Sequence, residues 1–271
     1  MTGLSRRRFM AGLAAAPISA GLATATAAPP DTPETWIAYE ARLRARLLDS
    51  GGGYVDEQLA QALLRATNAA RAAAGVAPLA PDPELARAAQ AHAADMCDRA
   101  YVEHLAPEGF DPSHRLGVLA RRRIGSAAEN IAYSRHVEAV GADHLMGLWR
   151  KSPPHWRNLV NPSHALAGVG AVRNGQRTYA VALYGRPAGA LGADLPFQLH
   201  EEAALVRALA RSSPPVDSFS LTDPTSERLL AAPAPADSPP RLARGVYELR
   251  PRRALGLGRV EVLWGPIFVR V

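Results

Sequence analysis

The spacing of apolar residues changes once along this chain, and this change limits the folds open to it. Up to about residue 150 apolar residues recur every three or four positions, as on helices that bury one face. Between Val169 and Tyr184 the pattern becomes two short strands around Asn174-Gly175, a dipeptide that tolerates the positive φ of a tight turn. Helices followed by paired strands predict an α+β domain ending near Pro187.

The helical part divides at turn residues and capping residues. Asp82 is a good N-cap with Pro83 at the first helical position, and Asp111-Pro112 repeats this arrangement. His92 lies on an apolar stripe, which favours a packed histidine with one hydrogen bond. We expect helices over residues 35–48 and 55–73, from residue 84 onward, from residue 112 to 119, and over 139–150, the last ended by Ser152-Pro153-Pro154.

The N-terminus is typical of an export signal. Ser5-Arg6-Arg7-Arg8-Phe9-Met10 precedes an alanine-rich apolar run, and Ala25-Thr26-Ala27 is a plausible cleavage site. The paired arginines indicate the twin-arginine class, so residues 1–27 are predicted to be a signal peptide. The run is too short and too rich in alanine to span a membrane comfortably, which favours cleavage over anchoring and no stable membrane span afterwards. We therefore expect a periplasmic or secreted protein.

Charge and cysteine content narrow the classes further. The formal charge of +6 comes half from Arg6, Arg7 and Arg8 in the predicted leader, and no basic stripe with interleaved aromatics follows. This argues against a nucleic-acid partner. Cys97 is the single cysteine, so no intramolecular disulfide can form, and we expect a small buried apolar group.

The last third of the chain differs in composition from the rest. Proline, alanine and serine concentrate at Pro214-Pro215 and over residues 231–240, as in linkers. Residues 258–271 alternate apolar and polar positions with Pro266 between them, which predicts two short strands or an edge strand. We expect an N-terminal helical segment at 28–58, a main domain at 59–187, and a linker with a β-rich extension of unknown role at 188–271.

Three segments concentrate polar side chains in an otherwise apolar middle: residues 103–109, 128–132 and 149–158. From chemistry alone, His104, Glu129 and His155 are one candidate set among several, because the chain has eight histidines. No HExxH, phosphate-binding loop, GxSxG or paired CxxC motif is present. His114 and His164 lie near turns, where solvation is the simplest expectation.

In this order, the three segments resemble the CAP superfamily (cysteine-rich secretory proteins, antigen 5 and pathogenesis-related 1 proteins, also called SCP-like), and most closely its short bacterial members. Residues 68–79 match the opening helix and turn of the family, Glu129-Asn130-Ile131 and residues 149–158 match later signatures, and Asn161-Pro162 and Gly168-Val169-Gly170 complete the series. Each segment alone is weak evidence, but together and in order they are specific.

The resemblance implies a three-layer α-β-α sandwich with a central antiparallel sheet and a surface cleft where His104, Glu129 and His155 converge. A second glutamate that completes a tetrad in many members corresponds here to Ser152, which argues against functions that require both carboxylates. Asn130, Ser152 and Trp156 are further candidate ligand-binding residues. The two imidazoles could ligate zinc, with Glu129 orienting one of them or acting as a general base.

Three functions remain open. The first is an exported module that binds a small molecule, a lipid or a cell-envelope component through the cleft. The second is a metal-assisted hydrolase or peptidase, with Glu129 as base and zinc held by His104 and His155. The third is a structural or interaction module, in which the polar residues form a network fixing loops to the sheet. Superfamily membership alone cannot choose among these, because one fold hosts many functions.

Overall fold

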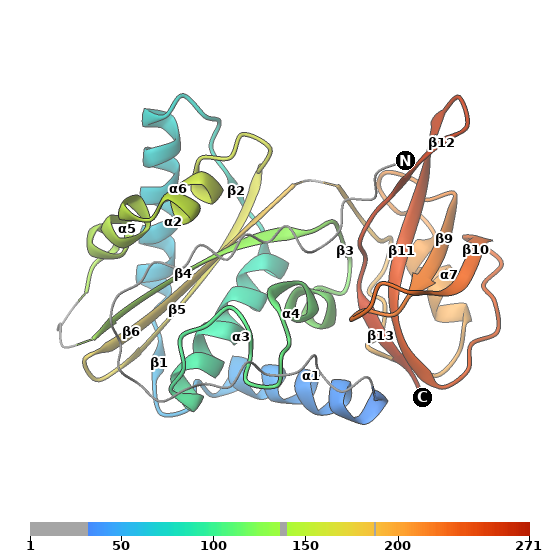
Figure 1. Cartoon of the computed structure of the whole chain (residues 1–271), viewed down its shortest axis with the longest axis horizontal. Coiled ribbons are helices and arrows are strands. Elements are labelled where there is room, and N and C mark those ends of the chain that lie inside the picture. Colours follow the sequence, from blue (N-terminus) through green and yellow to red (C-terminus); the bar gives the residue numbers. More distant parts are fainter. Residues whose placement is uncertain (1–31, 136–139, 187) are drawn as a thin grey trace.

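The computed structural model describes residues 32–135, 140–186 and 188–271, and it contains two lobes side by side (Figure 1). We name residues 32–186 the N-terminal lobe and residues 188–271 the C-terminal lobe. The predicted signal peptide, residues 1–27, lies outside the described residues. Within the described part of the chain, no helix has the length and apolar character needed to cross a membrane.

Capping residues begin four of the helices. Thr32, Asp56, Asp82 and Asp111 each accept a hydrogen bond from a backbone N–H of the first turn, which satisfies donors that the helix itself leaves unpaired. The helices are α1 (Pro33–Leu48), α2 (Glu57–Ala73), α3 (Pro83–Arg99), α4 (Pro112–Leu119), α5 (Ala142–Lys151), α6 (Pro153–Leu159) and, in the C-terminal lobe, α7 (Ala203–Leu209).

One expected helix end is also a helix start. The prolines after Ser152 end α5 as predicted, but they then occupy the first positions of α6. A proline at the first helical position loses no hydrogen bond, because its N–H would be unpaired there. The short helix that results carries His155, so this correction bears directly on the site.

The central sheet follows the predicted hairpin. Strands β5 (Leu166–Asn174) and β6 (Arg177–Gly185) pair antiparallel around a turn in which Gly175 has φ 54°. β4 (Ala127–Arg135) pairs antiparallel with the other edge of β6, and β1 (Tyr54–Val55) with β5. Two residues of β2 (Ala80–Pro81) run parallel to β5, so the sheet is antiparallel except at this short edge.

Helices cover both faces of this sheet (Figure 1). One apolar cluster joins α1, α3 and α4 to the sheet and includes Trp36 and Met96, each 0% exposed. A second cluster joins α2, α5 and α6 to the opposite face around Leu63 and Trp149. The mixed α+β fold is therefore as predicted.

Two glycines allow α3 to lie directly on β5. A Cβ atom added at Gly168 would lie 2.0 Å from the backbone nitrogen of Ala86, and one at Gly170 would lie 2.3 Å from that of Gln90. Any larger residue would push the helix off the sheet. The Gly168-Val169-Gly170 segment is thus explained by packing.

The C-terminal lobe is a second sheet around its own apolar core. Strand order is β10-β9-β11-β13-β8, with β12 paired to β11. The strands of this lobe are β7 (Gly189–Ala190), β8 (Gln198–Leu199), β9 (Ser218–Thr222), β10 (Leu229–Pro235), β11 (Gly245–Gly256), β12 (Arg259–Val262) and β13 (Ile267–Arg270), and β7 pairs with β3 (Arg123–Ile124) of the N-terminal lobe.

Part of the predicted linker is a strand. Residues 229–235 pair with β9 as β10, at the edge of the sheet, where proline is tolerated because one side of the strand needs no ladder hydrogen bond. The two short strands predicted around Pro266 are confirmed as β12 and β13. The β-rich extension is therefore present, and it packs as a sheet over most of its length.

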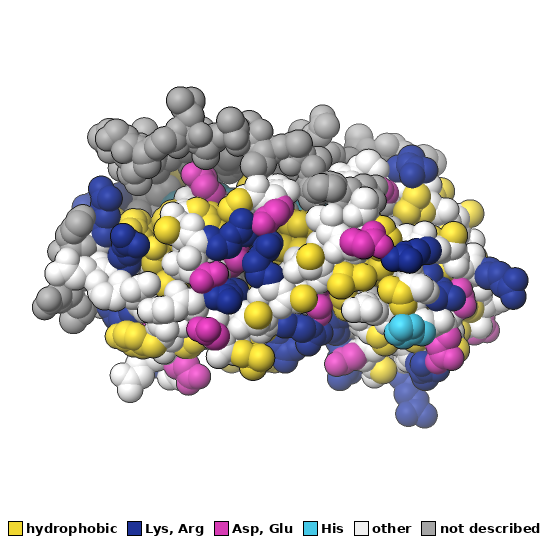
Figure 2. Space-filling view, turned by 90° about the horizontal axis from the view of Figure 1, so that it is seen from below, with side chains coloured by type: hydrophobic (Ala, Val, Ile, Leu, Met, Phe, Trp, Pro, Cys, Tyr) yellow, Lys and Arg dark blue, Asp and Glu magenta, His cyan; other side chains and the backbone are white. Residues whose placement is uncertain are grey.

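Direct contacts join the two lobes. Arg121 donates hydrogen bonds to the carbonyls of Leu195 (2.7 Å) and Ile267 (2.9 Å), and the backbone N–H of Gly125 donates to the carbonyl of Trp264 (2.6 Å). On the face seen in Figure 2, basic and acidic side chains alternate with small apolar patches. Apolar packing also joins the lobes, because Val246, Ile267 and Val269 belong to the same buried cluster as residues of α1, α3 and α4.

Candidate functional site

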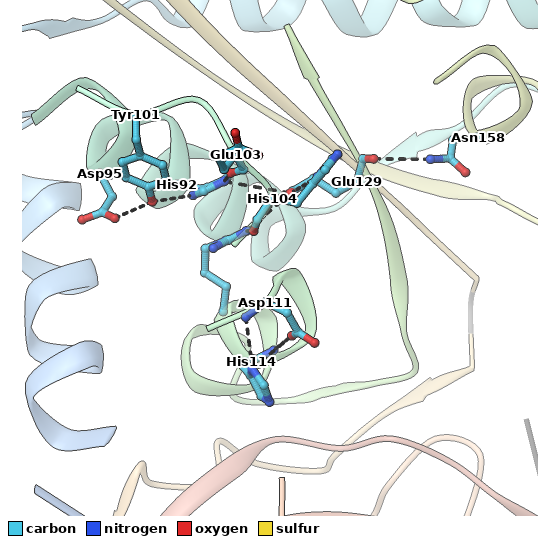
Figure 3. A network of polar contacts seen from close by, with 10 residues as sticks. His92, Asp95, Tyr101, Glu103, His104, Asp111, His114, Glu129 and Asn158 are labelled. Atoms are coloured by element: carbon cyan, nitrogen blue, oxygen red, sulfur yellow. Dashed lines mark hydrogen bonds and ion pairs between the residues drawn. The ribbon is translucent and has the colours of Figure 1, made fainter. Parts of the chain in front are cut away.

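A buried carboxylate lies at the centre of the predicted site. Glu129 is on β4, 3% exposed, and His104, from the loop after α3, donates from Nδ1 to Glu129 Oε1 over 2.8 Å (Figure 3). Arg115 of α4 lies 3.2 Å from Glu129 Oε2. The carboxylate thus holds together three segments that are separate in the sequence.

His104 presents the rest of its ring to the surface. Its side chain is 43% exposed, whereas that of Glu129 is 0% exposed. Because a carboxylate only accepts hydrogen bonds, Nδ1 of His104 carries the hydrogen and Nε2 remains to meet a ligand. His104 is therefore the member of the pair suited to direct contact with a bound molecule.

His155 lies beside His104, as the resemblance implies. The centroids of the two rings are 6.5 Å apart and the rings are inclined by 52°. The Asn130 side-chain amide donates to the carbonyl of His155 (2.9 Å), which fixes the first turn of α6 on β4. Burial lowers the pKa of His155, and the charge of His104 lowers it further, so His155 is neutral at pH 7.

Arg115 is a site residue that the sequence reasoning missed. It is 1% exposed, and its Nη2 also donates to the carbonyl of His104 (2.9 Å), so one guanidinium holds both the backbone and the carboxylate partner of His104. Burial alone would lower the pKa of Arg115, but the charge of Glu129 reverses this and raises it. The one feature of the sequence that could have identified Arg115 is its position among the apolar residues of a short helix capped by Asp111.

The ionic state of Glu129 follows from these neighbours. Burial alone would raise its pKa, but the charge of Arg115 and the hydrogen bond from His104 outweigh burial and lower the pKa to about 2. A carboxylate that binds protons this weakly is a poor general base at neutral pH. Its geometry favours an orienting role.

His92 also approaches this carboxylate. It is fully buried on α3 and donates from Nε2 to the carbonyl of Glu103 (3.0 Å), with Glu129 Oε1 4.0 Å away. Burial lowers the pKa of His92 to about 3, so its ring is neutral. His92 is packed as predicted, but its ring has two hydrogen-bond partners rather than one, because the Tyr101 hydroxyl lies 3.5 Å from Nδ1. Tyr101 and Asp95 extend the polar network behind it (Figure 3).

The other predicted ligand-binding residues are Asn130, Ser152 and Trp156. Asn130 is 0% exposed and is bonded to the carbonyl of His155 and to Asn158. Ser152 is 5% exposed, and Trp156 is half-buried with Arg150 over its ring at 5.7 Å. The role shown for Asn130 is to hold α6; ligand contact by any of the three stays a prediction.

The donor set does not fit a three-ligand zinc centre. In residues 32–135, 140–186 and 188–271, no group of three or more His, Cys, Asp or Glu side chains is placed to hold a metal ion. Glu129 is bound to Arg115, whose charge opposes that of a cation, which leaves two imidazoles. Zinc binding by the two imidazoles alone stays a prediction. Cys97 is buried as predicted (4% exposed), and burial raises the pKa of its thiol.

Comparison with known proteins matches the middle of the chain to one family. The sequence profile of the CAP, or cysteine-rich secretory protein, family matches residues 64–184. The uncharacterized protein YkwD of Bacillus subtilis is 32% identical over 112 residues, which is 40% of this chain and 40% of that protein. The match thus covers well under two thirds of this relative.

Solved structures with similar folds come from three bacteria. An extracellular SCP-domain protein from Bacillus anthracis is 28% identical, covering 48% of this chain and 41% of that one, with a TM-score of 0.41. An outer surface protein from Borrelia burgdorferi is 17% identical, covering 49% and 98%, with a TM-score of 0.43. A cysteine-rich secretory protein from Staphylococcus aureus is 19% identical, covering 48% and 38%, with a TM-score of 0.37.

The profile match covers the three polar segments together with the sheet that positions them, and it stops at the last central strand. The C-terminal lobe lies beyond it. Residues 64–184 of this chain, somewhat under half of its length, match the cysteine-rich secretory protein (CAP) family.

Proposed function

We propose that this protein is exported and that its CAP domain binds a small molecule, a lipid or a cell-envelope component at the His104–Glu129–His155 cleft. The observation that carries this is the contrast in exposure between His104 and the fully buried Glu129 to which it is bonded. Holding the His104–Glu129 pair in one geometry costs conformational entropy. The pair presents an oriented edge of the His104 imidazole beside the neutral imidazole of His155.

Export is supported by the predicted signal peptide, residues 1–27, and by similar proteins that are described as extracellular, secretory or outer-surface. The twin-arginine route belongs to the same proposal, because Arg6-Arg7 precede Phe9 and the apolar run. A periplasmic or a secreted location fits both observations.

Binding is better supported than hydrolysis. A hydrolase with Glu129 as base needs a carboxylate that takes a proton near neutral pH, and the pKa of Glu129 is about 2. The resemblance to the family also implies that Ser152 replaces a second glutamate that many members have. The three-layer CAP arrangement then serves as a rigid support for a recognition site.

The test is equilibrium binding to three probes: soluble peptidoglycan fragments, a long-chain fatty acid, and vesicles of anionic phospholipid. We expect one probe to bind, and we expect His104→Ala and His155→Ala each to weaken that binding about tenfold. His200→Ala, in which the exposed histidine of the C-terminal lobe is replaced, is the matched control and should bind normally. Binding of none of the probes, or equal loss in all three variants, contradicts the proposal.

The hydrolase alternative is tested separately. Turnover of peptide or ester substrates that is abolished by Glu129→Gln, with the fold intact by circular dichroism, would replace binding with catalysis as the function.

A further inference from the structure

A cavity of about 510 Å³ lies where the two lobes meet. Its walls from the N-terminal lobe include one side of α4, the start of β4 and part of α6, and the C-terminal lobe supplies Glu248, Trp264, Gly265 and Pro266. These four residues lie beyond the region that matches the CAP family. His104, Glu129 and His155 do not line the cavity, so it is distinct from the proposed cleft.

The size and lining are those of a small-molecule site. Pockets that enclose small ligands have volumes of roughly 300–1,000 Å³ and combine apolar walls with a few polar groups. Here Leu116, Ala120 and Pro266 supply apolar surface, and the indole of Trp264 lies among them. Its buried Nε1 finds no acceptor among the described residues. An indole N–H left in this state is a donor available to a ligand.

Positive charge dominates the lining. The lining contains three arginines, Arg123, Arg157 and Arg186, and one carboxylate, Glu248, which lies 3.9 Å from Arg250. Arg157 and Arg186 are exposed and make no ion pair with any described acidic residue. His164, also in the lining, adds little charge, because burial lowers its pKa.

Arg123 is a buried arginine in the lining of this cavity. Its side chain is 5% exposed and ion-paired to Asp82 at 2.5 Å, while its Nη2 donates to the carbonyl of Arg186 (3.2 Å). Its buried Nε finds no acceptor within the described ranges. Burying a guanidinium with an unused donor beside a cavity is costly, and an anionic oxygen is the group that would satisfy it.

The lobe contact makes this cavity a fixed feature. The backbone hydrogen bond from Gly125 to Trp264 closes one wall, and the bonds from Arg121 to Leu195 and Ile267 hold the lobes together. A ligand therefore enters a formed space, and little ordering entropy opposes its binding.

We propose that this cavity binds a small organic anion, with a phosphate or carboxylate group at Arg123, Arg157 and Arg186 and a compact apolar body against Leu116 and Trp264. The C-terminal lobe thereby adds a second ligand site to the CAP domain. This proposal does not depend on the His104–Glu129–His155 cleft.

Calorimetry with 2-naphthyl phosphate as probe tests the proposal, beside inorganic phosphate (the head alone) and 2-naphthol (the body alone). We expect 2-naphthyl phosphate to bind at least tenfold more tightly than either part. Arg157→Gln and Arg186→Gln should each raise its Kd about tenfold, as loss of a charge-assisted hydrogen bond does. Arg157→Lys should recover part of the affinity, and Arg65→Gln, at an exposed arginine of α2, should leave it unchanged.

The indole ¹H–¹⁵N resonance of Trp264, assigned with Trp264→Phe, gives a second readout and should move as 2-naphthyl phosphate saturates. Three results would overturn the proposal: no binding of 2-naphthyl phosphate, equal affinity for 2-naphthol, or an unchanged Kd in both glutamine variants. Because Arg157 and Arg186 are exposed, their replacement leaves folding intact, and each of these results can be interpreted.

Discussion

His104 donates a hydrogen bond to Glu129 across 25 positions of sequence, and the same carboxylate is bound by the buried Arg115. This arrangement fixes the Nδ1 edge of the His104 ring against the protein and leaves the Nε2 edge toward solvent. The function we propose rests on this asymmetry. Its energetic consequences can be measured without knowing the ligand.

Removing Arg115 should be among the most damaging single changes in the N-terminal lobe. Arg115→Met leaves Glu129 as a buried carboxylate without its cationic partner, which costs about 3–5 kcal/mol of unfolding free energy. Urea denaturation measures this, and Arg65→Met on the exposed face of α2 should change stability by less than about 0.5 kcal/mol. The double variant Arg115→Met/Glu129→Gln should regain part of the loss. If Arg115→Met alone were neutral, the ion pair would not hold the site.

Acid should destabilise the protein through His92 before it reaches the carboxylates. Burial lowers the pKa of His92 from 6.5 to about 3, so the unfolded chain binds a proton that the folded chain rejects. The contribution of the neutral His92 ring to the free energy of unfolding is fully present above pH 6.5 and declines as the pH falls toward 3. At pH 5 the loss is ~2 kcal/mol relative to pH 7.

His92→Gln tests this linkage. Urea unfolding at pH 7 and at pH 5 should show a smaller pH-dependent loss in the variant than in the parent protein, because glutamine does not titrate. Glu129 acts in a lower window: its pKa falls from 4.5 to about 2, so its contribution is present above 4.5 and is lost as the pH drops toward 2. An identical loss in parent and His92→Gln would contradict the account of His92.

The contact between α4 and β13 should be sensitive to one added methyl group. A Cβ atom at Gly117 would lie 2.7 Å from Ile267 Cδ1, so Gly117→Ala forces the lobes to shift and costs about 1–3 kcal/mol. Gly147→Ala in α5 is the matched control, because nothing lies within 4 Å of its added Cβ, and it should stabilise by about 0.5–1 kcal/mol through helix propensity. Thermal unfolding distinguishes the two. Gly117→Ala/Ile267→Val should relieve only part of the strain, because the Cγ1 atom at position 267, 2.8 Å from the added Cβ, remains.

Zinc should bind weakly. Two imidazoles remain after Glu129 is bound to Arg115, fewer than the three protein ligands of a catalytic zinc site. Calorimetric titration of the untagged protein at pH 7 should give no saturable binding at micromolar zinc, and His104→Ala and His155→Ala should give the same trace. A tight isotherm lost in both variants would bring metal-assisted chemistry back.

Local patterns predicted the elements of the N-terminal lobe well. The capping residues Asp82 and Asp111, and the hairpin at Asn174-Gly175, each use interactions within a few residues, which a sequence displays directly. The resemblance to the CAP family then brought His104, Glu129 and His155 together, and no spacing rule could have done so.

The features that could not be predicted from the sequence depend on contacts between distant segments. Nothing in the sequence around Arg115 indicates its role, which arises only because α4 packs against the strand that carries Glu129. His114 and His164 were expected to be solvated, but they are 6% and 9% exposed because other elements cover them. Residues 229–235 have the composition of a linker, and pairing with β9 makes them a strand. The cavity between the lobes could not be foreseen, because its two walls come from parts of the chain with no local relation.

The most direct test of the central claim is the protonation pattern of the His104 ring. Two-dimensional ¹H–¹⁵N spectra of the histidine side chains at pH 8 separate the two neutral tautomers. We predict that His104 carries its hydrogen on Nδ1, bonded to Glu129, and that Glu129→Gln shifts its ring nitrogens while the exposed His200 does not move. A His104 ring with its hydrogen on Nε2, or one that behaves as His200 does in both proteins, would contradict the account.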